Sequence, residues 1–380
     1  MLAPLTRHVG RAALSIARQH AATTSLPAAL SYLPTQSIHS PVTTNTGRRS
    51  VAQAAATPPL QRVLVTGALG QIGSELVDAL RTRVGTDNVI ASDLRGLSST
   101  AGGPFVQLSV TDETRVREVV EAERIDTIYH LAALLSVTGE ANPKLCEDIN
   151  IGGTSNVLHA AREFGCRVFM PSSIAVFGPD TPRTAPQYVP LAPTTVYGRT
   201  KVIGEEMALR YWKEHRVDVR GIRYPGLISY KAPPGGGTTD YAVAIFHEAL
   251  ATRRYQCFVR PDTILPMMYI DDAIRATLML MDAPAEWLGD ARAGYNVAGC
   301  SFRADELVAS IRRHLPDLEV EYVPDARQVI ADSWSDALDD SVARQEWGWQ
   351  AEFTLDRLVD AMFEGLDPEH RQRQQQALSN

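Results

Sequence analysis

The stretch VLVTGALGQIG, residues 63–73, constrains the fold more than any other part of the sequence. Its first residues are β-branched or aliphatic and run into Gly67, Gly70 and Gly73, and apolar residues at helical spacing follow as far as Arg81. This pattern predicts a strand, a tight turn and the start of a helix. A glycine at the strand end permits positive φ, and glycines at the helix mouth let a pyrophosphate approach the free N–H groups of the first turn.

A second predicted strand, residues 89–93, ends in the carboxylate of Asp93, twenty residues after Gly73. An acid at that place takes the ribose hydroxyls of a dinucleotide and repels the 2′-phosphate of NADP, so NAD is the predicted cofactor. The alternative is a structural glycine turn with a surface aspartate, which the strand–turn–helix context disfavours. The predicted cofactor contacts of this part are Gly67, Gly70, Gln71, Ile72, Gly73 and Asp93.

Strands and helices continue to alternate after Asp93, which predicts an α/β fold with a doubly wound parallel Rossmann sheet. Predicted strands cover residues 105–108, 126–133 and 167–170, and predicted helices cover 113–123, 150–164 and 202–214. Small residues close the strand 126–133 and leave room for a cofactor, so Leu131, Ala132 and Ala133 are predicted cofactor contacts. His130 beside them is more readily explained as structural than as catalytic.

A serine, a tyrosine and a lysine form the predicted catalytic group. Ser173 follows the strand 167–170, and Tyr197 and Lys201 stand four residues apart at the opening of a helix, on one face of it. A phenol has a pKa of about 10, and a neighbouring ammonium and a positive nicotinamide both favour its phenolate. Tyr197 is therefore the predicted base and Ser173 the predicted partner of the substrate hydroxyl. The alternative is a packed tyrosine with a solvated lysine.

With these residues in place, the sequence resembles the extended short-chain dehydrogenase/reductase family, which includes sugar-nucleotide epimerases and dehydratases. Within that family it is similar to the short-chain type of L-threonine 3-dehydrogenases over about residues 62–365. The stretches that carry this closer resemblance are residues 134–142, 224–229, 234–243, 265–272, 331–334 and 340–349.

The resemblance implies roles for particular residues. It implies that Ser173, Tyr197 and Lys201 are catalytic, and that Tyr197, Lys201 and Tyr224 contact the cofactor. Residues implied to line a threonine pocket are Ser136, Ser173, Tyr197, Thr238 and Asp240, with the Asp240 carboxylate suited to the substrate ammonium. From composition alone, the Gly- and Pro-rich residues 233–239 would be a flexible surface loop. The chain departs from many epimerases at Ser109, where they carry an acid, and Asp112 nearby is suited to cap the next helix.

The implied activity is NAD-dependent oxidation of L-threonine at its 3-hydroxyl to 2-amino-3-oxobutanoate. The implied partners are a second copy of the chain, paired through the helices 150–164 and 202–214, and functionally a 2-amino-3-ketobutyrate CoA ligase. Two alternatives stay open at this point: a sugar-nucleotide epimerase or dehydratase on the same scaffold, and a non-catalytic NAD-sensing protein. The second has no need of Tyr197, Lys201 and Ser173.

The N-terminal segment has a charge pattern of its own. Residues 1–60 carry five arginines and no acidic residue. The rest of the chain contains the other 32 basic residues and all 44 acidic residues, so its formal charge is −12. Residues 1–57, basic, amphipathic and Ser/Thr-rich, are typical of a mitochondrial transit segment, which predicts a matrix location. The acidic remainder excludes charge-driven nucleic-acid binding, and no apolar run reaches the roughly 18 residues of a membrane span.

The expected domain organisation follows from these motifs. Residues 61–233 form the NAD-binding domain, 234–370 form mainly a smaller C-terminal substrate-binding α/β domain, and 264–300 return to the Rossmann core. Residues 371–380 form a tail. Four separated cysteines without a Cys-x-x-Cys pair predict reduced thiols and no metal site.

Overall fold

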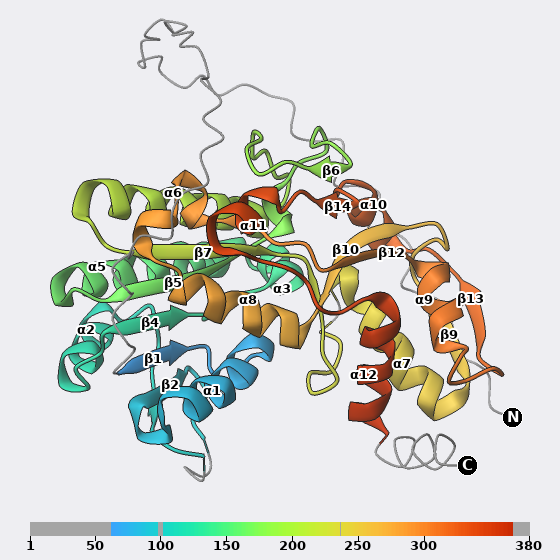
Figure 1. Cartoon of the computed structure of the whole chain (residues 1–380), viewed down its shortest axis with the longest axis horizontal. Coiled ribbons are helices and arrows are strands. Elements are labelled where there is room, and N and C mark those ends of the chain that lie inside the picture. The colour runs from blue at the N-terminus through green and yellow to red at the C-terminus, as the bar shows by residue number, and fades with distance from the viewer. Residues whose placement is uncertain (1–61, 98–101, 236, 368–380) are drawn as a thin grey trace, which may run out of the picture. The chain divides into compact units, whose positions relative to one another are not determined.

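A seven-stranded sheet forms the centre of the part of the chain that the structure describes (Figure 1). The computed structural model describes residues 62–97, 102–235 and 237–367. The strand order is β11-β7-β5-β4-β1-β2-β3, and every neighbouring pair is parallel. The strands are β1 (Val63–Thr66), β2 (Val89–Asp93), β3 (Phe105–Gln107), β4 (Thr127–His130), β5 (Arg167–Ser173), β7 (Val219–Tyr224) and β11 (Tyr295–Asn296). This order, reversing between β1 and β4, confirms the predicted doubly wound fold.

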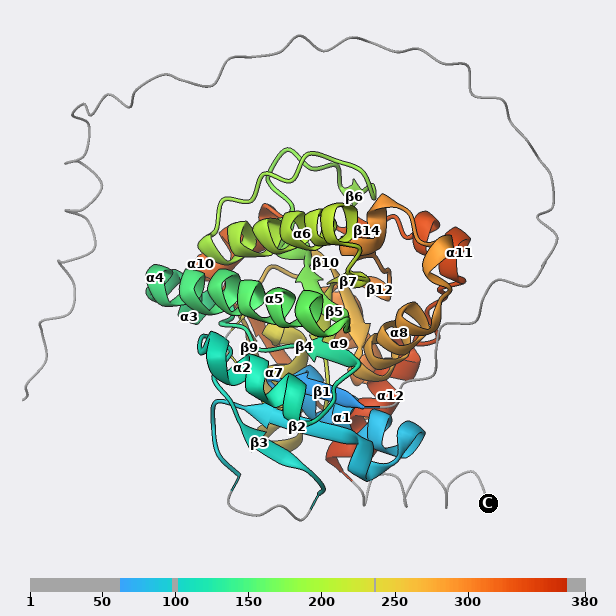
Figure 2. The ribbon, with the colours of Figure 1, turned by 90° about the vertical axis from the view of Figure 1, so that its left-hand side faces the viewer.

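Helices cover both faces of this sheet (Figure 2). On one face lie α2 (Glu113–Ala122), α5 (Thr154–Phe164) and α6 (Val196–His215), and on the other α1 (Gln71–Val84) and α8 (Ile270–Asp282). Because side chains alternate along a strand, Val63 and Val65 of β1 join one apolar core while Leu64 joins the other. The strands of a sheet buried in this way are apolar throughout, and all four residues of β1 are buried.

The C-terminal half adds smaller sheets and helices. A three-stranded sheet, β12-β10-β8, and two strand pairs, β13-β9 and β14-β6, lie outside the large sheet. Their strands are β6 (Thr184–Ala185), β8 (Gly226–Ile228), β9 (Arg254–Cys257), β10 (Ile264–Tyr269), β12 (Cys300–Arg303), β13 (Glu319–Tyr322) and β14 (Ala337–Leu338). The helices are α7 (Tyr241–Thr252), α9 (Ala304–Ile311), α10 (Ala326–Asp332), α11 (Ser341–Trp347) and α12 (Leu355–Leu366). Within residues 264–300, β11 belongs to the large sheet and α8 covers one of its faces. Strand β10 belongs instead to the three-stranded sheet.

Several element boundaries differ from the sequence prediction. β4 ends at His130, because β1 beside it turns away at Gly67 and the pairing of the two strands stops at Thr66 and His130. β5 continues through Ser173, where β7 still pairs with it. The helix predicted from residue 150 begins as a π-helix, and α6 begins at Val196. Two short α-helices that the sequence did not predict are α3 (Ser136–Ala141) and α4 (Pro143–Glu147). The π-helix is η3 (Asp148–Gly153), and the single-turn 3-10 helices are η2 (Thr86–Asn88), η4 (Ile174–Val176), η5 (Thr238–Asp240), η6 (Ala285–Trp287) and η7 (Asp290–Ala293).

The predicted transit segment 1–57 and tail 371–380 lie outside the described residues. Within the described ranges, none of the helices has the length and apolarity that crossing a bilayer requires. The boundary between two domains at residues 233 and 234 stays a prediction.

Candidate active site

The glycine turn between β1 and α1 has the shape that a dinucleotide requires. Gly67 has φ +68°, and a Cβ atom there would lie 2.7 Å from the backbone nitrogen of Ala132. A Cβ atom at Gly73 would overlap the Gly67 carbonyl oxygen and lie 2.8 Å from Ala68 Cα. No side chain caps α1, and its first turn, which contains Gln71 and Ile72, carries no acid. The first N–H groups therefore face a cradle without a competing carboxylate, and these residues fit a pyrophosphate.

Asp93 stands at the end of β2, beside this turn. Its carboxylate accepts hydrogen bonds from the backbone N–H of Leu69 at 3.1 Å and of Arg95 at 3.0 Å. The Arg95 guanidinium pairs with it at 3.1 Å. Burial raises the pKa of Asp93, but the hydrogen bonds from Arg95 and Leu69 outweigh it and leave the pKa below its usual value. Asp93 is therefore an ionised acceptor at the predicted ribose position, and Arg95 is a neighbour that the sequence analysis missed.

The chain that follows β4 is held next to the glycine turn. The Thr66 carbonyl accepts from Leu131 N at 3.1 Å, and the Thr66 hydroxyl accepts from Ala132 N at 3.3 Å. Asn150 donates to the Leu134 carbonyl at 3.0 Å and accepts from Leu134 N at 2.8 Å. The same amide donates to Thr200 of α6 at 3.0 Å. Asn150 thus joins the 131–134 segment to α6, although nothing in its sequence position indicated this role.

Helix α6 brings the three predicted catalytic residues together. Its N-terminus is fixed because the Thr195 hydroxyl accepts from Gly198 N at 3.0 Å. The Ser173 side chain lies near the Tyr197 phenol and lowers its pKa. Lys201 Nζ donates to the Pro171 carbonyl at 2.9 Å and lies 5.6 Å from the centre of the Tyr197 ring. The predicted convergence at the end of β5 is present in the structure.

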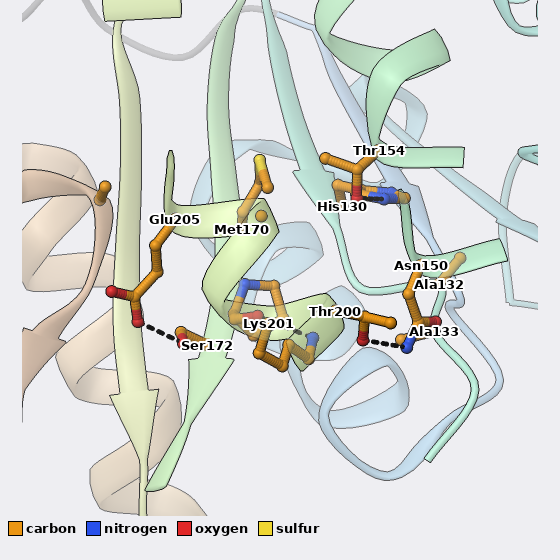
Figure 3. A pocket seen from close by; sticks show the side chains of 13 residues that line it. His130, Ala132, Ala133, Asn150, Thr154, Met170, Ser172, Thr200, Lys201 and Glu205 are labelled. Carbon is orange, nitrogen blue, oxygen red and sulfur yellow. Dashed lines mark hydrogen bonds between the residues drawn. The ribbon is translucent and has the colours of Figure 1, made fainter. Parts of the chain in front are cut away.

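A cavity lies between α6 and the carboxyl ends of β4 and β5 (Figure 3). The close-up shows Ser172 and Glu205 on one side of Lys201, and Thr200 and Asn150, joined by a hydrogen bond, on the other. The lining residues are His130, Ala132, Ala133, Asn150, Thr154, Met170, Pro171, Ser172, Thr200, Lys201, Gly204, Glu205 and Ala293. The carboxyl ends of parallel strands are where ligands bind in open α/β sheets.

Burial sets the acid–base character of the catalytic pair. It raises the pKa of Tyr197 to about 12, although the nearby Ser173 side chain acts to lower it. It lowers the pKa of Lys201 to about 8, while the charges of Cys146 and Glu205 act in the opposite direction. The sequence predicts that Lys201 lowers the pKa of Tyr197, but in the chain by itself burial dominates and the pKa is raised. The lysine donates to Pro171 rather than to the phenol oxygen.

His130 has contacts on both ring nitrogens. Nδ1 lies 2.9 Å from the Thr66 hydroxyl, and Nε2 lies 3.2 Å from the Thr154 hydroxyl. Burial lowers the pKa of this histidine to about 3, so its ring is neutral at physiological pH. The first contact joins β4 to β1 and the second joins β4 to α5, which supports a structural role for His130.

The residues expected in a threonine pocket lie on two other segments. Ser136 begins α3, which packs against the N-terminus of α6. Thr238 is buried in η5, which contacts β8 and α10. Asp240 of the same turn accepts from Gly237 N at 2.8 Å, so part of its carboxylate stabilises its own loop. The phenol of Tyr224 is buried and hydrogen-bonded to Thr277 of α8, and its role as a cofactor contact stays a prediction.

The sequence analysis also missed three polar residues beside the catalytic group, namely Ser172, Glu205 and Arg223. The Glu205 carboxylate accepts from Ser172 Oγ at 2.5 Å and from the Arg223 guanidinium at 2.9 and 2.7 Å. One signal was available, because Glu205 follows Lys201 by four residues and therefore shares its helix face. Over the described ranges, no three side chains of His, Cys, Asp or Glu gather in a way that could hold a metal ion.

Comparison with known proteins identifies relatives that cover most of the chain. The mitochondrial L-threonine 3-dehydrogenase of Bos taurus is 48% identical over 307 residues, which is 80% of this chain and 82% of that protein. The holo form of a GalE-like L-threonine dehydrogenase from Cupriavidus necator is 49% identical, with a TM-score of 0.79 over 80% of this chain and all of that chain. A monomeric L-threonine 3-dehydrogenase of metagenomic origin is 48% identical, with a TM-score of 0.77 over 81% of this chain and 99% of that chain.

The family model that matches describes the NAD dependent epimerase/dehydratase family, and the match covers residues 63–298. That range begins with the glycine turn and includes Asp93, the end of β5 and the start of α6. The match confirms the predicted resemblance and the prediction of NAD as cofactor. This chain belongs to the NAD dependent epimerase/dehydratase family.

Proposed function

We propose that this protein is an L-threonine 3-dehydrogenase, which oxidises the 3-hydroxyl of L-threonine to give 2-amino-3-oxobutanoate and reduces NAD. The observation that carries the proposal is the meeting of Tyr197, Lys201 and Ser173 at the end of β5, next to the glycine turn. Relatives that are 41–50% identical and match nearly whole chains are named as enzymes of this activity.

The cofactor would be held by residues of three segments. The glycine turn would take its pyrophosphate, Asp93 its adenosine ribose, and residues 131–133 would lie beside its nicotinamide half. When bound, NAD accepts the hydride that leaves C3 of the substrate.

The chain's own residues would handle the proton and the substrate oxygen. Tyr197 takes the proton of the 3-hydroxyl, and Ser173 donates a hydrogen bond that orients the oxygen. A phenol of pKa about 12 is mostly protonated at neutral pH, so the positive charges that face it must lower its pKa before it acts. Lys201 supplies one of these charges. Its own low pKa, about 8, means that it carries this charge fully below that pH.

The substrate's remaining groups need partners outside α6. Asp240 would pair with the ammonium of threonine, while hydroxyls such as those of Ser136 and Thr238 would hold its carboxylate. The product is a β-keto acid, which loses carbon dioxide readily and gives aminoacetone. A CoA-dependent ligase that cleaves it to glycine and acetyl-CoA is therefore the functional partner that we propose.

The sugar-nucleotide alternative requires basic side chains that can take a diphosphate. Three arginines of the C-terminal half that could serve are already paired: Arg253 with Asp317 at 3.5 Å, Arg254 with Glu319 at 3.0 Å and Arg260 with Asp332 at 2.7 Å. These pairs argue against a diphosphate site there and favour the amino-acid substrate.

We further propose a mitochondrial matrix location and a homodimer that pairs α5 and α6. Residues 1–57 have the transit composition, and the Bos taurus and Sus scrofa relatives are named as mitochondrial. A relative that is 48% identical is described as monomeric, so the oligomeric state has to be measured for this chain. Sedimentation of the purified protein at micromolar concentration would distinguish a species near 41.5 kDa from one of twice that mass.

The activity is tested by following NADH at 340 nm with NAD and one candidate substrate at a time. The candidates are L-threonine, D-threonine, L-serine and UDP-sugars. We expect NADH with L-threonine and loss of that signal in Tyr197→Phe. Turnover of a UDP-sugar without NADH release, and no signal with L-threonine, would contradict the proposal and favour an epimerase.

A further inference from the structure

Three side chains on one face of helix α6 lie against three successive residues of β5, and two of them are hydrogen-bonded to the strand. Lys201 donates to the Pro171 carbonyl at 2.9 Å. Glu205 accepts from the Ser172 hydroxyl at 2.5 Å, and Tyr197 lies near Ser173, which lowers the pKa of its phenol. The three helical residues are spaced by four, so they lie one above another along the helix. The catalytic pair is therefore continued by a third contact that our mechanism does not use.

Glu205 is itself fixed by a second strand. Arg223 of β7 holds its carboxylate through Nε at 2.9 Å and Nη2 at 2.7 Å. Ser172 and Arg223 are direct partners in the β5–β7 pairing. Neighbours in register project to the same side of a sheet, and both donors reach the one carboxylate of α6. Bidentate contact of this kind fixes orientation as well as distance.

The network continues to the edge of the sheet. Arg223 also donates to the Gln187 carbonyl at 3.0 Å and to Asn296 Oδ1 at 3.2 Å. The side chains of Glu205 and Arg223 are only 10% and 8% exposed, so their charges are largely removed from water. Removing one partner of such a pair leaves a buried charge without its counterion, which is costly for any fold. The pair is thus a rigid connection between α6 and two strands.

We propose that Glu205 is a positioning residue: through Ser172 and Arg223 it fixes α6 against the end of β5 and so sets the distance of Tyr197 and Lys201 from Ser173. The proposal rests on the proposed function, because it assigns these three residues to the reaction. Proximity of this kind matters in catalysis, since a displacement of about 1 Å can cost on the order of a hundredfold in rate.

The charge of Glu205 has a second effect, on the lysine one turn before it. The titratable groups that surround Lys201 are Tyr197, Cys146, His130 and Glu205. Among them Cys146 and Glu205 raise the pKa of the lysine against the lowering by burial. Loss of the Glu205 charge therefore lowers the pKa of Lys201 further.

The main test uses Ser172→Ala, which removes one bond to Glu205 and leaves the buried ion pair intact. Ser310→Ala is the matched control, because Ser310 is also buried and donates to a carboxylate, that of Asp356 at 2.8 Å. For Ser172→Ala we expect kcat about tenfold lower, with KM for L-threonine and the dissociation constant of NAD within about twofold of the wild-type values. With L-threonine deuterated at C3, the isotope effect on kcat should rise, because the chemical step is the one slowed. Wild-type kcat in Ser172→Ala, or an equal loss in Ser310→Ala, would overturn the proposal.

A second test needs no turnover. The chain has four lysines, Lys144, Lys201, Lys213 and Lys231, so isotope-labelled lysine NMR can follow each titration separately. In Glu205→Gln the pKa of Lys201 should fall below its wild-type value while the pKa values of the other three stay unchanged. An unchanged Lys201 titration in a folded Glu205→Gln protein would overturn the proposal. If the wild-type protein fails to oxidise L-threonine, only the proposed function is lost, and this titration still decides whether Glu205 acts on Lys201.

Discussion

Asp93 accepts a hydrogen bond from the backbone N–H of Leu69 at 3.1 Å and so joins the end of β2 to the glycine turn. The same carboxylate pairs with Arg95, whose side chain is 65% exposed. The acid that would bind the ribose of NAD is therefore also the group that neutralises a nearby guanidinium.

This arrangement predicts that Asp93→Ser changes cofactor preference. We expect the dissociation constant of NAD to rise about tenfold, since the ribose loses a charged acceptor. Binding of NADP should improve at the same time, because the freed Arg95 can pair with the 2′-phosphate. Calorimetric titration of both cofactors measures this, with Asp112→Ser as control, since the exposed Asp112 caps α2 and a serine still can. An unchanged NAD to NADP ratio in Asp93→Ser would contradict the assignment of Asp93.

The glycine turn predicts that Gly73→Ala is severely destabilising. The new Cβ atom would overlap the Gly67 carbonyl and lie 2.8 Å from Ala68 Cα. Neither backbone segment can move away without disrupting the turn. We expect a loss of several kcal/mol in the free energy of unfolding, or no soluble protein. Gly152→Ala is the control, because a Cβ atom there meets nothing within 4 Å. Its stability should be unchanged or higher by up to about 1 kcal/mol, and denaturant unfolding compares the two.

The low pKa of Lys201 predicts that this catalytic residue lowers the free energy of unfolding of the protein at neutral pH. Its pKa is about 8 in the folded protein and 10.5 for an unperturbed lysine in the unfolded chain, so below about pH 8 the folded protein must hold a charge that the unfolded chain carries more easily. Lys201→Met should therefore be more stable than the wild type at pH 7, by on the order of 1–3 kcal/mol. Between about pH 8 and 10.5 the unfolded chain binds more protons than the folded protein. The free energy of unfolding of the wild type should therefore rise relative to that of Lys201→Met as the pH increases through this range.

Thermal unfolding of both proteins from pH 6 to pH 10 measures the difference. Lys144→Met, whose wild-type side chain is 80% exposed, is the control and should show no such pH dependence. A wild-type protein more stable than Lys201→Met at pH 7 would mean that the contacts of the lysine outweigh its desolvation.

An ion pair predicts a link between the cofactor helix and the loop proposed to bind substrate. Lys231, at the start of the segment that leads to Thr238 and Asp240, pairs with Glu75 of α1 at 2.7 Å. Lys231→Met should raise KM for L-threonine several-fold, since the loop loses an anchor. Arg83→Met breaks a comparable pair, with Asp282 of α8 at 2.7 Å, and should leave KM unchanged. Equal KM values in both variants and the wild type would show that the anchor has no role in substrate binding.

The sequence was sufficient for the first five strands of the large sheet, β1 to β5, because their signals are local, whereas β7 and β11 were not predicted. The glycine spacing, the acid at residue 93 and the apolar runs each depend on neighbours within one strand–turn–helix unit, and the structure has the predicted alternation of strands and helices. The pairing of β14 with β6 joins residues about 150 positions apart, with two residues on each strand, and such short strands leave no periodic pattern.

The catalytic group was predictable for the same reason, but the residues that hold it in place were not. Tyr197 and Lys201 share a helix turn, which sequence spacing reveals. By contrast, Arg223 reaches Glu205 and Asn296, 18 and 73 residues away. A polar residue whose partner is that distant has no spacing to mark it, and the buried arginine reads as a surface charge until the fold is known. The raised pKa of Tyr197 was likewise hidden, because burial is a property of the packed chain.

The most direct test of the central claim follows the hydrogen atom that is transferred. L-threonine carrying deuterium at C3 is incubated with the protein and NAD, and the reduced cofactor is weighed by mass spectrometry. We predict one deuterium in each NADH formed by the wild-type protein, and no NADH from Tyr197→Phe. NADH without deuterium, or undiminished NADH from Tyr197→Phe, would contradict oxidation at C3 with Tyr197 as the base.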